Sequence, residues 1–145
     1  SQDIQEVTNE DGSDEDDFED NKDQYIKHIS FLQPSELHLE LSKGGVGTMP
    51  SRWEQWGVAV HEYTQFGMPL LLSNACGAAN ELLISGLNGF KFIDGDLDDL
   101  LKGMKKFTSI SAKEYLDMSK SSVLLSRKID PEISAASLLS VLYDN

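Results

Sequence analysis

The sequence predicts an α/β fold in which short parallel strands alternate with crossover helices. Short apolar runs at 45–51 and 70–74 are separated by a segment of helical character, and Gly or Pro residues stand at the junctions. Strands and helices that alternate at this spacing are typical of a parallel sheet covered by helices. With 145 residues, of which 39% are hydrophobic, the chain is long enough for one modest core.

The negative charge is concentrated in the first 24 residues. They hold eleven acidic residues and one lysine, a net charge of −10, whereas the other 121 residues hold fourteen acidic and eleven basic residues, a net charge of −3. High charge with few aliphatic side chains is the composition of a disordered segment, so we expect a disordered segment over 1–24 and a folded domain over 25–145. Such a surface repels nucleic-acid phosphates and anionic lipids, which argues against both as main partners.

Cysteine content and hydropathy indicate the compartment. The chain has one cysteine, Cys76, which cannot form an intramolecular disulfide and therefore suits a reducing compartment. No apolar run reaches the roughly 18 residues of a membrane span, and the first residues do not resemble a signal peptide. We expect a cytoplasmic protein without a transmembrane segment.

In chain order, the first predicted elements are a strand and a short helix. The segment YIKHISFL, 25–32, alternates apolar and polar residues as a half-buried strand does. Pro34 interrupts this pattern, and Ser35 is the expected N-cap of a helix in SELHLELSK.

The central elements are two strands joined by a helix. The strands are expected at 45–51 and 70–74, and the helix from about Gly57 to Phe66. Gly67 is a natural C-terminal cap for this helix, and Pro69 cannot continue it.

The last elements are one strand and four helices. Asn88-Gly89 marks a tight turn before the strand FKFI. Asp96 is expected to open a helix with acidic residues in its first turn and lysines in its last, as the helix dipole prefers. Asp130 is the expected cap of the final helix, with Pro131 at its first position. The four helices are predicted at about 78–84, 96–107, 111–128 and 130–145.

Two carboxylates bracket the start of the helix over 57–66. Glu54 precedes the helix and Glu62 lies inside it, so their carboxylates are expected to be on the order of 10 Å apart. Between them, the backbone N–H groups of 55–58 are unsatisfied donors at the positive end of the helix dipole, which favours a phosphate or a hydroxyl-rich ligand. The spacing is too wide for two carboxylates acting on one bond. It predicts instead that they hold two ends of one ligand, by hydrogen bonds with its hydroxyl groups.

Residues 50–92 also contain a distinctive series of fixed residues. They are Pro50-Ser51, Glu54, Trp56-Gly57, Glu62, Gly67 and Pro69, Ser73, Gly77, Glu81 and Asn88-Gly89. In this order they resemble the signature of the donor-binding half of retaining GT-B glycosyltransferases of family 4. The resemblance implies a Rossmann-like parallel sheet with flanking helices, the C-terminal half-domain of a GT-B fold.

The resemblance also implies roles for individual residues. Glu54 would hold hydroxyl groups of the transferred sugar, and Glu62 the ribose hydroxyls of the nucleotide. The backbone between them would face the sugar and the diphosphate through Gln55, Trp56, Gly57 and Val58. The implied function is transfer of a hexose from a nucleotide-diphospho-sugar with retention of configuration, in the synthesis of a surface polysaccharide such as lipopolysaccharide or capsule. No metal or other cofactor is expected, and beyond the positioning role of Glu54 no catalytic residue is assigned.

The chain departs from this family in its cations and its length. Family members place an Arg and a Lys on the diphosphate from the start of this domain, whereas the cations before Pro50 are Lys22, Lys27 and Lys43, none in the matching context. The chain is also less than half as long as a typical two-domain GT-B enzyme. We therefore expect part of a two-domain hexosyltransferase that is inactive by itself. Its glycan or lipid-linked acceptor would bind through an N-terminal domain outside this sequence, and the full protein is compatible with peripheral membrane association.

Two other functions fit the sequence. One is a non-catalytic domain of the same fold that binds a nucleotide, a sugar or a protein partner. The other is a glucan-building or phosphorolytic enzyme, which normally needs a lysine-rich site that is not visible here.

Several nearby residues have structural interpretations. We expect His61 to be structural or at the surface, and Cys76 to be packed. Trp53 and Trp56 are expected to pack rather than to stack on a sugar or base. Glu81 is expected to interact with the dipole of its helix.

Overall fold

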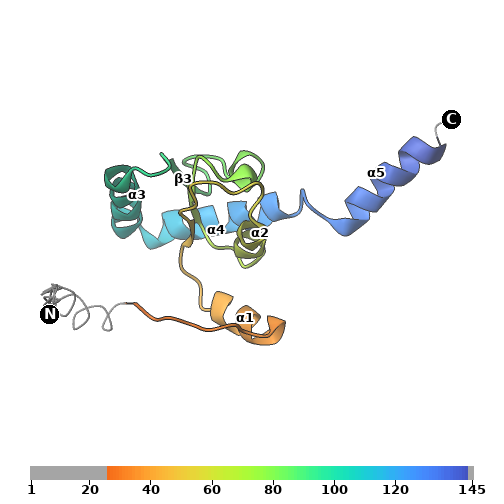
Figure 1. Ribbon diagram of the computed structural model, residues 1–145. Helices are drawn as coiled ribbons and strands as arrows, with labels where there is room; N and C mark the ends of the chain where they lie inside the picture. Colours follow the sequence, from red (N-terminus) through yellow and green to blue (C-terminus); the bar gives the residue numbers. More distant parts are fainter. Residues whose placement is uncertain (1–25, 144–145) are drawn as a thin grey trace, which may run out of the picture. The chain divides into compact units, whose positions relative to one another are not determined.

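The computed structural model describes residues 26–143, so the segment predicted to be disordered, 1–24, lies outside the described residues (Figure 1). The chain divides into two units, 1–33 and 34–145, which are considered separately. In the first unit, 26–33 have no regular secondary structure, so the strand predicted over 25–32 is wrong for the described residues. A strand requires hydrogen bonds with a neighbouring strand, and the described part of this unit contains none.

The second unit is built on a three-stranded parallel sheet. Its strands are β1 (Gly47–Met49), β2 (Leu70–Ser73) and β3 (Gly89–Phe92), in the order β1-β2-β3. In the register of the sheet, Leu71 of β2 pairs with Thr48 on one side and Phe90 on the other. All four residues of β2 are buried, as expected for a central parallel strand between two layers of helices. The predicted α/β class and all three predicted strands of this unit are confirmed.

Most of the predicted helices are also confirmed. They are α1 (Pro34–Leu41), α2 (Val58–Gln65), α3 (Leu97–Ser109), α4 (Ala112–Ser126) and α5 (Pro131–Tyr143). A short 3₁₀ helix, η1 (Gly77–Asn80), lies between β2 and β3. Gly67 follows α2 with a φ of 68°, as the predicted cap requires. The side chains of Asp96 and Asp130 accept hydrogen bonds from the N–H groups of Asp99 and Glu132, which confirms both as caps.

Two details of the predicted helices are wrong. Ser35 is not an N-cap, because α1 already begins at Pro34, whose fixed φ and missing N–H suit the first helical position. The helix predicted over 78–84 is reduced to η1, since Asn88 takes the backbone groups that would continue it. The Ile84 N–H donates to Asn88 Oδ1 at 2.8 Å, and Asn88 Nδ2 donates to the Leu82 carbonyl at 2.9 Å.

One face of the sheet carries the main core. Leu70 and Leu72 pack there with Val60 of α2 and with the buried segment around η1. α4 packs beside α2 on this side (Figure 1). A buried hydrogen bond of 2.8 Å, from the Ser122 hydroxyl of α4 to the Met68 carbonyl, joins this helix to the start of β2.

The opposite face of the sheet is covered by α3. Gly103 of this helix lies so close to Leu71 that an added Cβ would be 2.6 Å from Leu71 Cδ1. The rings of Phe90 and Phe107 meet edge to face, with centroids 5.2 Å apart. The sheet is therefore a middle layer, and its carboxyl end remains available for a site.

The start of α4 is capped by side chains. Ser111 and Glu114 form a capping box at the start of α4, in which the Ser111 N–H and hydroxyl both donate to Glu114 Oε2 at 2.7 Å.

In α5 every described side chain is exposed. Within 26–143, no helix is both long and apolar enough to cross a membrane.

We expect the substitution Glu114→Gln to make the stability of the folded chain less dependent on pH in the acidic range. The hydrogen bonds from Ser111 lower the pKa of the Glu114 carboxyl in the folded chain. A lowered folded-state pKa contributes stability above the unfolded-state value of about 4.3, and this contribution is lost as the pH falls through the folded-state value. When the pH is lowered from 7 to 3, the melting temperature should therefore fall less for Glu114→Gln than for wild type. Glu81→Gln, at an exposed position, is the control, and equal losses in all three proteins would contradict the prediction.

Candidate functional site

The candidate site lies at the carboxyl end of the sheet, where open α/β folds bind their ligands. Two loops meet there, one after β1 and one after β2. The Glu54 N–H donates to the Ala75 carbonyl at 3.2 Å, and the Gly77 N–H donates to the Glu54 carbonyl at 2.9 Å. The Ala78 N–H donates to the Trp56 carbonyl at 2.8 Å. These bonds fix the loop of Glu54 against the loop that follows β2.

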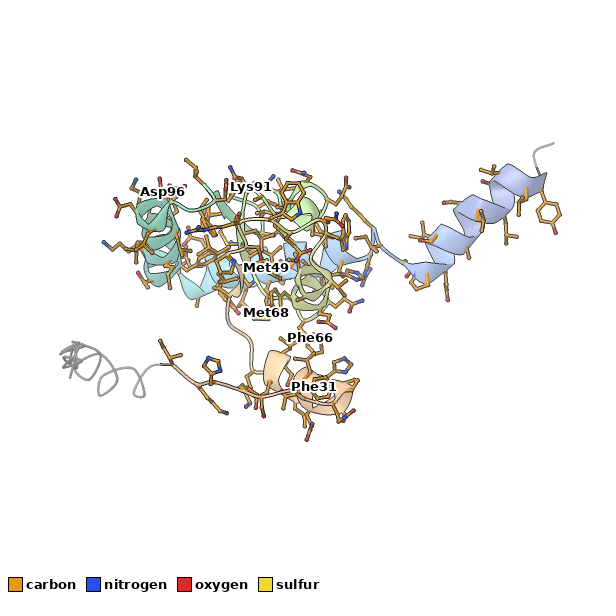
Figure 2. The ribbon with its side chains drawn as sticks, viewed as in Figure 1. Phe31, Met49, Phe66, Met68, Lys91 and Asp96 are labelled. Atoms are coloured by element: carbon orange, nitrogen blue, oxygen red, sulfur yellow. The ribbon has the colours of Figure 1, made fainter. Side chains whose placement is uncertain are left out.

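The strands are parallel, and Figure 2 labels residues near them. Lys91 and Asp96, near and beyond the end of β3, lie toward one side of the sheet and its helices. Met68, which precedes β2, lies toward the other side. Because the strands are parallel, the ends of β1 and β2 open toward the same side as the end of β3.

Two glycines allow the loops to approach so closely. Gly77 faces the Gln55 carbonyl, and a Cβ added at Gly77 would lie 1.9 Å from that oxygen. Gly57 has a φ of 94°, in the left-handed region that favours glycine, and an added Cβ would lie 3.1 Å from Cys76 Sγ. The backbone path of residues 54–57 therefore depends on both glycines.

The loop leads directly into α2 with few of its donors used. Gly57 is the N-cap of α2 and provides no side-chain hydrogen bond to the helix. Among the described residues, the N–H groups of Gly57 and Val58 have no hydrogen-bond acceptor. The Trp56 N–H donates to Glu54 Oε1 at 3.2 Å, so one of the four predicted backbone donors is engaged by Glu54 itself. The free donors lie at the positive end of the α2 dipole, as an anion site requires.

Glu54 lines a cavity of about 340 Å³ between the two loops. The cavity is formed by Trp53, Glu54, Gln55, Asn74, Ala75, Cys76, Gly77 and Asn80. Glu62 does not line it. That residue is half-buried on α2, where its negative charge, after the larger effect of burial, raises the pKa of Tyr63.

The structure adds Asn74 and Asn80 to the residues that the sequence indicated. Asn74 immediately follows β2, and a polar residue directly after a buried strand is a signal that could have identified it. Asn80 is the one polar residue in η1, and its position beside Asn74 depends on the fold.

Arg52 is a further residue that sequence reasoning missed. It is exposed, it lies two positions before Glu54, and it lines a neighbouring cavity of about 290 Å³ with Asp96 and Leu97. Within 26–143, Arg52 forms no ion pair. It is therefore a cation near the loop that is available to a phosphate.

Cys76 and His61 have structural roles. Cys76 is buried, and its Sγ donates to the Trp56 carbonyl at 3.4 Å. Burial raises the pKa of its thiol, with a smaller contribution from the charge of Glu54, so the prediction of a packed residue is confirmed. His61 Nε2 lies 3.1 Å from the Ser126 carbonyl and joins α2 to α4, which bears out its structural interpretation.

Two predictions at neighbouring residues are wrong. Trp53 does not pack, since 81% of it is exposed at the edge of the cavity. Glu81 does not lie in the first turn of a helix, because η1 ends before it. For the described residues, no group of three or more His, Cys, Asp or Glu side chains could hold a metal ion. Independence of metal remains a prediction.

The sequence profile of the family described as glycosyl transferases group 1 matches residues 11–123. The chain belongs to this family. The match includes both strand-end loops and α2, so the candidate site lies within the part of the chain that matches the family profile.

Among solved structures, this member of the group 1 family is similar to sucrose-phosphate synthase from Thermosynechococcus elongatus. The TM-score is 0.67 at 17% sequence identity, over 80% of this chain and 29% of that chain. At this identity the likeness shows the fold, which is the Rossmann-like half-domain of a GT-B glycosyltransferase. The chain spans less than a third of the matched structure's length. A comparison with curated proteins gave no match.

Proposed function

We propose that this chain is the donor-binding part of a hexosyltransferase that uses a nucleotide-diphospho-sugar and retains the configuration of the sugar. The main support is the loop from Glu54 to Val58, which brings a carboxylate and unpaired backbone donors to the carboxyl end of the sheet. Its place in a group 1 glycosyltransferase gives this arrangement a sugar as its expected ligand.

Each part of the donor matches a different group in the loop or in α2. Glu54 Oε1 accepts from the Trp56 N–H, which leaves Oε2 to accept from a sugar hydroxyl. The N–H groups of Gly57 and Val58, with the α2 dipole behind them, suit the diphosphate. Glu62 on α2 would accept hydrogen bonds from the ribose hydroxyls.

The proposed reaction depends on positioning and on stabilising charge. In a front-face displacement with retention, the bond from the anomeric carbon to the phosphate oxygen breaks while the acceptor oxygen attacks the same face. The leaving phosphate takes the acceptor's proton. A helix N-terminus supplies only about half a positive charge, so the departing diphosphate needs further cations. Arg52 is one candidate, and groups outside this chain would supply the others.

The wider setting follows from the same proposal. The acceptor, a glycan or a lipid-linked saccharide, would bind a domain outside this sequence, and this chain alone would transfer little sugar. We place the complete enzyme in the synthesis of surface polysaccharide on the cytoplasmic side of the membrane, without a metal cofactor.

Titration calorimetry of this chain with diphosphate sugars of uridine, guanosine and adenosine tests donor binding. We expect one of them to bind, and Glu62→Ala to weaken that binding about tenfold, because a hydrogen bond to a charged group contributes roughly 1.5–3 kcal/mol. Glu81→Ala, at an exposed position outside the cavity, should bind as wild type does. The absence of heat with every donor would refute the proposal and favour a non-catalytic domain of the same fold.

A further inference from the structure

The cavity beside Glu54 differs in chemistry from a diphosphate site. Its lining contains one carboxylate and three side-chain amides, and no Lys, Arg or His. Lys91 bonds Asn80 Oδ1 at 3.1 Å but does not itself line the cavity, so a ligand would face the carboxylate without a lining cation. This arrangement repels phosphate and favours a neutral ligand. The volume of about 340 Å³ lies at the lower end of ligand pockets, which span roughly 300–1,000 Å³, and therefore suits one ring rather than a nucleotide.

The two asparagines of the cavity are oriented by bonds at their outer sides. Asn74 Oδ1 accepts from the Asp94 N–H at 2.9 Å, and Asn80 Oδ1 accepts from Lys91 Nζ at 3.1 Å. Each bond uses the amide oxygen and leaves the Nδ2 group as a donor. With Glu54 Oε2 as an acceptor, the cavity offers both donors and an acceptor, which is the set that neighbouring hydroxyl groups require.

Trp53 adds an apolar surface to this polar set. Its exposed fraction of 81% means that the fold gains little from burying it, although it is one of the largest apolar side chains in the chain. The same side chain lines the cavity with the two asparagines. An aromatic ring beside hydroxyl-binding groups matches the two surfaces of a sugar, whose C–H face is apolar and whose edge carries the hydroxyls.

We propose that this cavity binds a neutral hexopyranose ring, which stacks on Trp53 and is held at its hydroxyls by Asn74, Asn80 and Glu54. The inference rests on the proposed function and extends it, because it assigns a preference for uncharged hexoses over uronic acids. A neutral hexose reaches the cavity either as the sugar of the donor or as a ring of the acceptor, and both share this chemistry.

The test follows the two tryptophan indole N–H signals by NMR, assigned with Trp53→Phe and Trp56→Phe. The probes are methyl glucoside, methyl galactoside, methyl mannoside and methyl glucuronide, and the diphosphates of uridine, guanosine and adenosine with and without a hexose. We expect a neutral hexoside or a diphosphate hexose to shift the Trp53 signal, and the glucuronide to bind at least about threefold more weakly. Trp53→Ala should weaken hexose binding about tenfold and Trp53→Phe only about threefold.

The probes separate this inference from the proposed function. A shift with free hexosides indicates an acceptor ring, whereas a shift only with diphosphate hexoses indicates the donor sugar, and either result supports the inference. Nucleoside diphosphates should bind Trp53→Ala as they bind wild type. If diphosphate hexoses bind wild type and Trp53→Ala equally, or if no hexose probe shifts Trp53, the inference is overturned while the proposed donor site stands. If no nucleotide binds but hexosides shift Trp53, the donor proposal fails and the sugar cavity remains.

Discussion

Replacing Gly77 by alanine is expected to destabilise the folded chain by about 3 kcal/mol or more. The added Cβ would lie 1.9 Å from the Gln55 carbonyl oxygen and 2.8 Å from its carbon, so the clash is with backbone rather than with a flexible side chain. Backbone overlap of this kind is relieved only when the loops separate, which breaks the bond from the Gly77 N–H to the Glu54 carbonyl. Donor binding should be lost together with stability.

A matched substitution isolates the cause of this loss. Gly95 has a φ of 73°, but no atom lies within 4 Å of an added Cβ, so Gly95→Ala introduces backbone strain without a clash. We expect it to cost about 1 kcal/mol in chemical denaturation, against the larger cost for Gly77→Ala. Equal costs at the two positions would show that the close approach of the loops does not constrain Gly77.

Asn88→Ala is expected to lower the free energy of unfolding by about 3 kcal/mol. Asn88 is fully buried and bonds the Ile84 N–H, the Leu82 carbonyl and the Ser122 hydroxyl. Removal of the amide leaves the Ile84 N–H and the Leu82 carbonyl without this partner. Leu82 is fully buried, and a buried unpaired group costs about 1–3 kcal/mol. For a domain of this size, the melting temperature should fall by roughly 10 °C.

A double-mutant cycle tests whether Asn88 and Ser122 act as one hydrogen-bonded network. Ser122→Ala removes the hydroxyl that links Asn88 to the Met68 carbonyl, and its effect should not add to that of Asn88→Ala. Asn80→Ala, at an exposed position, should change stability by less than about 0.5 kcal/mol. Strict additivity in the cycle, or a small effect of Asn88→Ala, would contradict a network that ties α4 to the sheet.

The prediction of the candidate site from the sequence was partial for a physical reason. Glu54 and the start of α2 could be found because a carboxylate, a glycine and a helix start are adjacent in the chain. Asn74 and Asn80 come from the next crossover, so their position beside Glu54 depends on the register of β1 and β2. The exposure of Trp53 likewise depends on how the two loops pack.

The sequence by itself determined the α/β class, the three strands of the sheet and the caps of α3 and α5, because periodicity and capping act between residues a few positions apart. Only the tertiary structure decided that residues 78–84 form no α-helix and that 26–33 form no strand. In the first case the buried Asn88 side chain took the backbone groups a helix needs, and in the second the described residues of that unit contain no neighbouring strand. Both outcomes depend on hydrogen-bond partners that local sequence does not specify.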